Sequence, residues 1–127
     1  MNYGFSKIVA LSFDEAIEKV TNELKKEGFG VLTAIDLKET LKKKIGVDVP
    51  RYTILGACNP HFAHKALQTE VEVGLLLPCN VIVYESDGST HVSVFDPLVM
   101  EKIIENPAMK PIAEDVQQKL RRVIAAM

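Results

Sequence analysis

The stretch CNVIVYESDGSTHVSVF, residues 79–95, decides the fold class, because two strand-forming runs stand on either side of Asp87-Gly88. An Asp-Gly pair in this position is typical of a two-residue hairpin turn. The register of that hairpin pairs Val83 with Val92 and Val81 with Val94, which makes the valine side an apolar face. Extending the register places Cys79 opposite Asp96, with its thiol pointing inward. The stretch therefore predicts two neighbouring antiparallel strands.

Helix signals alternate with strand patterns along the rest of the chain. Strands are expected at residues 3–11, 29–35, 51–57 and 73–85. Helices are expected to begin at capping residues or cap-proline pairs, namely Ser12, Asp36, Asn59-Pro60, Asp96-Pro97 and Asn106-Pro107. Pro78 interrupts the fourth expected strand. Because proline cannot donate to a ladder, we expect an edge position or a bulge there.

The resulting order of elements is β-α-β-α-β-α-β-β-α-α. The chain has 127 residues, which fits one domain spanning residues 1–127. The closing hairpin favours a predominantly antiparallel sheet with helices packed mainly on one face. A doubly wound parallel sheet is disfavoured, because no glycine-rich loop joins a strand to a helix. The sequence therefore predicts an α+β fold.

Charge and cysteine content limit the classes of function. The formal net charge is −2, so the chain lacks the basic excess of a typical nucleic-acid-binding protein. The run Lys42-Lys43-Lys44 is expected on a solvated helix face. Two cysteines are too few for a secreted disulfide scaffold, and the N-terminus shows no signal-peptide pattern. No apolar run reaches the ~20 residues of a membrane span. We expect a cytoplasmic protein with reduced thiols that binds neither nucleic acid nor membranes.

Two segments share a Cys-Asn pair: ILGACNP at residues 54–60 and GLLLPCNVIVYE at residues 74–85. With the expected elements around them, they resemble the signature of the domain-of-unknown-function family DUF302, over essentially the whole chain. The resemblance implies a small α+β domain with a curved antiparallel sheet of the TATA-binding-protein-like class, and a homodimer. It implies no activity, and a fold shared with a nucleic-acid binder does not carry that function over.

A metal site is one interpretation of the chemistry-bearing residues. Cys58, His61, His64 and Cys79 are the ligand types that zinc or another transition metal prefers. The spacing Cys-x₂-His-x₂-His is not that of a standard zinc finger, and the helical wheel turns both histidines away from the inward Cys79. A site built from His61 and His64 would be easier to complete across a subunit interface, because positions i and i+3 are neighbours on a helix. The candidate metal ligands are therefore Cys58, His61 and His64. The alternative is two ordinary surface histidines.

Thiol chemistry is a second interpretation. Cys58 immediately precedes the expected N-cap Asn59, where the positive end of a helix dipole could stabilise a thiolate. His61 could act as its base, but no third orienting group is identified; Asp96 is a candidate only through the hairpin register. The alternative is a buried and inert thiol. A Cys58–Cys79 disulfide needs Cα atoms within ~7 Å, a distance that sequence does not provide.

The two asparagines differ in how well the sequence explains them. Asn59 is accounted for as an N-cap. Asn80 lies in an apolar strand just after Pro78, so we expect it to anchor a bulge there or to supply a polar contact in a ligand pocket. Such a pocket could also be lined by Arg51, Tyr52 and Tyr84.

Three functions stay open, because no phosphate loop, Gly-x-Ser-x-Gly, His-Glu-x-x-His or EF-hand pattern occurs. The first is a small cytoplasmic binding or sensing module with a ligand groove at the two Cys-Asn segments, formed by Cys58, Asn59, Cys79 and Asn80. The second is a cysteine-dependent enzyme or redox protein that uses Cys58 with His61. The third is a structural or regulatory homodimer in which both segments serve packing alone.

Overall fold

The Asp87-Gly88 turn joins β4 (Cys79–Ser86) to β5 (Ser89–Phe95) in the computed structural model, which describes residues 1–127. Both turn residues have positive φ, 52° at Asp87 and 76° at Gly88, as a type I′ hairpin turn requires. Val81 pairs with Val94 and Val83 with Val92. The predicted hairpin and its register are confirmed.

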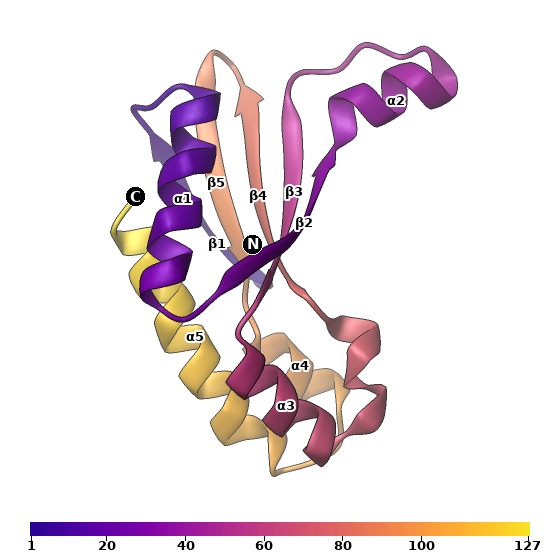
Figure 1. The fold of residues 1–127 in the computed structure, drawn as a ribbon, viewed down its shortest axis with the longest axis vertical. Helices are drawn as coiled ribbons and strands as arrows, with labels where there is room; N and C mark the ends of the chain where they lie inside the picture. Colours follow the sequence, from indigo (N-terminus) through magenta and orange to yellow (C-terminus); the bar gives the residue numbers. More distant parts are fainter.

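Five strands form one antiparallel sheet in the order β1-β5-β4-β3-β2 (Figure 1). The remaining strands are β1 (Gly4–Val9), β2 (Gly30–Asp36) and β3 (Tyr52–Cys58). All four pairings are antiparallel, and one irregularity, between Val31 and Thr33, interrupts the pairing of β2 with β3. The predicted α+β class with a predominantly antiparallel sheet is therefore confirmed.

Two long helices cover one face of this sheet. They are α1 (Phe13–Lys26) and α5 (Met109–Ala125), and both bury apolar residues against the valine side of the hairpin. The alternating residues of the strands point to the other side, which we call the open face. Its members are Gly4, Ser6, Ile8, Thr33, Ile35, Tyr52, Ile54, Gly56, Asn80, Ile82, Tyr84, His91, Ser93 and Phe95.

The remaining helices lie at opposite ends of the long axis (Figure 1). α2 (Leu37–Ile45) connects β2 to β3 at one end. At the other end are α3 (Pro60–Thr69), the 3₁₀ helix η1 (Val71–Leu76) and α4 (Leu98–Ile103). None of the helices is long and apolar enough to cross a lipid bilayer.

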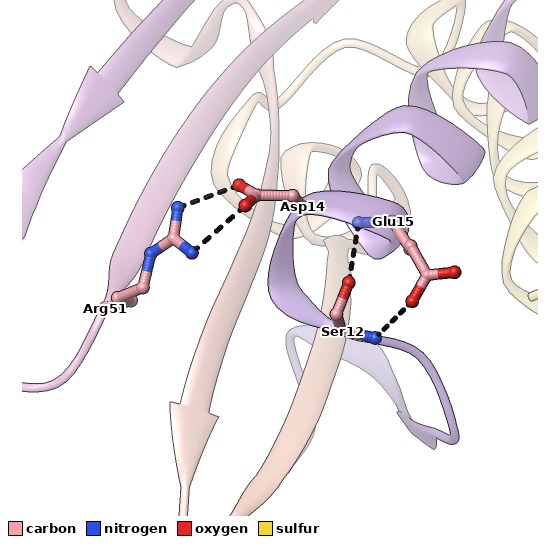
Figure 2. Close-up of polar contacts among 4 residues, drawn as sticks. All are labelled: Ser12, Asp14, Glu15 and Arg51. Atoms are coloured by element: carbon pink, nitrogen blue, oxygen red, sulfur yellow. Dashed lines mark hydrogen bonds and ion pairs between the residues drawn. The ribbon is translucent and has the colours of Figure 1, made fainter.

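The start of α1 is held both locally and from β3, as Figure 2 shows. Ser12 Oγ accepts from the Glu15 amide at 3.2 Å, and Glu15 Oε1 accepts from the Ser12 amide at 3.1 Å, which confirms the predicted capping box. Arg51, next to β3, donates to Asp14 at 2.8 Å, and its guanidinium lies 4.0 Å from the centre of the Phe13 ring. Arg51 therefore contacts the start of α1, on the face of the sheet that the helices cover.

The strand expected at residues 73–85 is wrong in its first part. Residues 71–76 form η1, and the strand begins only at Cys79, so Pro78 precedes the ladder and sits neither at a bulge nor within the strand. The backbone amides of Val73 and Leu77 donate to the carbonyls of Glu70 and Gly74, at 3.0 and 3.3 Å. This apolar run folds locally because Val73 packs against helices instead of against a neighbouring strand.

The core is divided into two apolar clusters. The larger has 17 buried residues and lies between the sheet and the helices α1 and α5. The smaller has four buried residues, Ala66, Val73, Met100 and Met109, and lies among α3, η1, α4 and the start of α5. The seam between the two clusters is where the candidate site is found.

Candidate functional site

A cavity of about 390 Å³ opens between the two apolar clusters. Thirteen of its 16 lining residues are hydrophobic, and none is charged. The lining consists of Phe29, Leu32, Thr33, Ala57, Cys58, Asn59, Phe62, Ala63, Ala66, Leu67, Leu77, Pro78, Cys79, Met100, Ile112 and Val116. Its volume lies in the range of about 300–1,000 Å³ that small-molecule sites occupy.

Both clusters contribute walls to this cavity. Phe29, Ala57 and Val116 belong to the larger cluster, whereas Ala66 and Met100 belong to the smaller one. Small side chains lie where β3 ends and α3 begins, at Ala57, Ala63 and Ala66, and they leave the space that larger residues would fill. The cavity therefore exists because the two clusters meet there without filling their seam.

The two Cys-Asn segments meet at this cavity. Cys58 is the last residue of β3, and Cys79 is the first residue of β4, where it pairs with Ala57. Both thiols line the cavity, and both cysteines are free. Cys58 is half-buried, whereas Cys79 is buried, so the predicted inward direction of Cys79 is confirmed.

Burial sets the chemical state of Cys79. The loss of solvation, with a smaller effect from Cys58, raises the pKa of the Cys79 thiol from 9.0 to about 11. The thiol is therefore protonated at neutral pH and acts as an apolar wall.

Asp96, the candidate orienting group, is held by other residues: its Oδ1 accepts from the Leu98 amide and from Gln117 Nε2, both at 3.0 Å. Its carboxylate thus joins the start of α4 to the middle of α5.

Asn59 is a structural residue at the edge of the cavity. Its side-chain oxygen accepts from the Phe62 amide at the start of α3, as expected of an N-cap. Its Nδ2 donates to the Glu27 carbonyl at 3.3 Å, which ties α3 to the end of α1. Asn59 therefore positions the Cys58 wall, with one N–H and one lone pair of its amide engaged in structural hydrogen bonds.

Asn80 is not brought to this cavity. It is exposed on the open face, in regular register with Gly56, so the expectation that it anchors a bulge is wrong. The irregularity of the sheet lies instead in β2, on the far side of β3. Asn80 lines a separate hollow of about 480 Å³ together with Tyr52 and Tyr84. The polar-contact interpretation of Asn80 thus belongs to a different surface from the thiols.

The histidines point away from the thiols, as the helical wheel predicts. His61 and His64 are both exposed on α3, while Phe62 and Ala66 of the same helix line the cavity. No three His, Cys, Asp or Glu side chains are grouped closely enough to hold a metal ion. A metal site at Cys58, His61 and His64 is therefore not assembled by one subunit, and its completion by a second subunit stays a prediction.

Several cavity residues carry no sequence signal of their own. Leu77, Met100 and Ile112 come from three segments far apart in sequence, and only the tertiary fold brings them together. Phe62 and Ala66 are different, because their spacing of four residues marks the inner face of α3. That spacing, next to the Cys-Asn pair, is the signal that could have located one wall.

Comparison with known proteins agrees with this architecture. The family described as "Domain of unknown function DUF302" matches residues 5–127. A crystal structure of an uncharacterized conserved DUF302 protein from Bacillus stearothermophilus is 31% identical, with a TM-score of 0.93 over 99% of this chain and 98% of that chain. No curated protein matches the sequence. The resemblance drawn from the two Cys-Asn segments is therefore confirmed over nearly the whole chain.

Proposed function

The chain belongs to the DUF302 family, and from its cavity we propose that it is a binding module for a small, neutral, apolar ligand. One observation carries the proposal: a cavity of about 390 Å³ with 13 hydrophobic residues among the 16 that line it. Apart from two thiols, its polar side chains are Thr33 and Asn59, and the amide of Asn59 makes two hydrogen bonds within the protein.

The lining determines the class of ligand. A carboxylate or ammonium group would lose its hydration without meeting an opposite charge, which is costly in an apolar site. An uncharged ligand avoids that penalty and gains free energy by removing apolar surface from water. The ligand would touch Cys58 and Cys79 and leave the exposed histidines uninvolved.

Uptake of the neutral fluorophore N-phenyl-1-naphthylamine tests this proposal. We expect saturable fluorescence enhancement with the wild-type protein and weaker binding by Ala63→Leu, which fills the cavity from α3. Ala125→Leu, on an exposed position of α5, is the matched control and should bind like the wild type. Leu67→Ala widens the opening and should preserve binding. No saturable uptake by folded wild-type protein, or equal uptake by Ala63→Leu, would overturn the proposal.

A cysteine-dependent reaction is the second candidate, because half-buried Cys58 lines the same cavity. Cys58→Ser tests it: a thiol-dependent function is lost in this variant, whereas apolar binding is retained. Alkylation of intact protein, followed by peptide mapping, reports whether Cys58 is the reactive thiol.

The proposal includes a homodimer and a cytoplasmic location. The homodimer is what the family resemblance implies, and native mass spectrometry measures it directly. The cytoplasmic location is supported by two unpaired thiols, one of them half-buried. Fractionation of cells that produce the protein tests the location.

A further inference from the structure

We propose that the open face is the surface through which two copies of this chain pair, in opposite strand directions, so that α2 of each copy lies against the α3–η1–α4 end of the other. The inference deepens the proposed homodimer by assigning its interface. It is independent of the cavity ligand.

The open face carries no Asp, Glu, Lys or Arg on any of its five strands. Charged residues make up 25% of the chain, so a solvated sheet face of this size would normally carry several. Ile8 and Ile35 are exposed on it. An uncharged face can lie against a copy of itself without opposing like charges.

Aromatic packing on this face disfavours nucleic acid as the occupant. The rings of Tyr52 and His91 stack on Tyr84 from either side, with centroids 5.4 and 4.8 Å away. Nucleic-acid bases need free ring faces to stack on and basic groups for their phosphates. Both faces of Tyr84 are occupied, and no strand residue of the open face is a Lys or Arg.

One end of the open face is bordered by a basic helix, α2, that packs against β2 and β3. α2 has no buried residue, and Leu37 and Leu41 line a hollow together with Tyr52 and Tyr84 of the open face. Its last turn carries Lys42, Lys43 and Lys44, and the neighbouring Ile45 is 66% exposed. We call residues 37–47 the basic arm. Lys42 and Lys43 form exposed ion pairs with Asp48 and Glu39, which stabilise little and can be exchanged for a partner's carboxylates.

The other end of the open face is acidic and carries exposed apolar residues. Phe95 of the open face packs against the smaller apolar cluster, which places this end beside the face. A hollow of about 430 Å³ is lined there by Glu70, Glu72 and Glu105, together with apolar residues of η1 and α4. Val71 and Leu75 are 76% and 84% exposed. We call this hollow the acidic end.

A two-fold axis across the strands brings these ends together. The basic arm and the acidic end lie at opposite ends of the molecule (Figure 1). Turning the second copy end over end puts each basic arm on the partner's acidic end, twice, and the assembly closes at two copies. The lysines and exposed apolar residues of each basic arm then contact the glutamates and exposed apolar residues of the partner's acidic end.

The available area approaches that of a standard interface. Five strands about 4.8 Å apart and about 20 Å long present roughly 480 Å² of plane. Protruding side chains and the contacts at the two ends add to this area, toward the ~800 Å² per partner of a standard interface.

Sedimentation velocity of charge-reversed variants tests the interface. We expect the wild type to be a dimer, and Lys42→Glu/Lys44→Glu and Glu72→Lys/Glu105→Lys each to weaken it about tenfold or more. Combining all four substitutions restores opposite charges and should recover the dimer. Lys25→Glu/Lys26→Glu, on exposed positions at the end of α1, is the matched control and should leave it intact. Ile82→Lys, in the middle of the open face, should give a folded monomer.

Each contrary result has a distinct meaning. A monomeric wild type overturns both the homodimer and this interface. A dimer that none of the variants weakens overturns the interface and leaves the proposed homodimer standing. Assemblies that grow beyond two copies with concentration overturn the closed two-fold arrangement.

Discussion

Asn59 lies between β3 and α3, where its side-chain oxygen accepts one hydrogen bond and its side-chain nitrogen donates another. Asn80, in contrast, is exposed on the open face. We therefore expect Asn59→Ala to lower the free energy of unfolding by about 1–2 kcal/mol, since a helix cap and a tie to α1 are lost. Asn80→Ala, the matched substitution at the second Cys-Asn pair, should change it by less than about 0.5 kcal/mol. Urea denaturation of both variants measures the difference. Equal effects would contradict the structural role of Asn59.

The Cys79 thiol makes stability depend on pH in the alkaline range. Its pKa is raised from 9.0 to about 11 in the folded chain, chiefly by burial. The unfolded chain therefore releases this proton near pH 9, while the folded chain keeps it until about pH 11. Unfolding is favoured as pH rises through this window, with a full effect of about 2 to 3 kcal/mol.

Comparing the wild type with Cys79→Ala isolates this effect. Other groups titrate in the same range in both proteins, so the informative quantity is the difference between their pH dependences. Urea denaturation below pH 9.0 and near pH 11 should show a larger loss of stability in the wild type. Parallel pH profiles would mean that Cys79 ionises in the folded chain as readily as in the unfolded one.

At the scale of residues, the sequence predicts which way a side chain points better than it predicts what the side chain does. Hairpin register and helix periodicity alone predict that Cys79 points inward and that His61 and His64 point outward. Asn80 was misinterpreted because its role depends on whether β4 bulges after Pro78, and the strand begins only after that proline. A regular register leaves Asn80 on the open face.

Among the elements, β2, β3 and Pro78 approach one another closely at Gly56. A Cβ added there would lie 2.8 Å from Pro78 Cγ and closer still to Thr33 Oγ1. We expect Gly56→Ala to lower the free energy of unfolding by about 1–3 kcal/mol, as overpacking does. Gly30→Ala is the matched control in β2, since an added Cβ meets nothing within 4 Å.

Thermal or urea denaturation of the two glycine variants measures this contact. If Gly56→Ala unfolds like the wild type, the approach of Pro78 to β3 must be loose enough to yield. If Gly30→Ala is equally destabilised, the cause is the strand conformation of glycine and not the close approach.

Element boundaries could be predicted wherever a local signal marks them. The capping box at Ser12, the asparagine-proline start of α3 and the Asp-Gly turn all lie where expected. Residues 71–76 lack such a signal: an apolar run before a proline suits a strand or a short helix equally well. The contact of Val73 with Met100 and Met109 decides between them, and those residues are distant in sequence.

For the whole molecule, the division of the core into two clusters explains why the cavity could not be predicted. Periodicity shows which residues are buried but not which of two cores they join. The cavity lies at their junction, where lining residues from both clusters face one another. Of the four residues expected at a groove, Cys58, Asn59 and Cys79 line the cavity and Asn80 does not. The fold adds walls from α4 and α5.

The same division predicts where the molecule opens first. The smaller cluster has four buried residues against 17 in the larger, so α3, η1 and α4 have less apolar burial to hold them than β4 and β5. Hydrogen exchange should therefore be faster in residues 60–76 and in α4 than in the central strands.

N-phenyl-1-naphthylamine, if it occupies the seam, should slow exchange in α3 and at the end of β3 while leaving α2 unchanged. Ala63→Leu should remove the slowing without changing exchange in the central strands. If hydrogen exchange slows only in α2, the fluorophore binds at the basic arm, and the seam is not the ligand cavity.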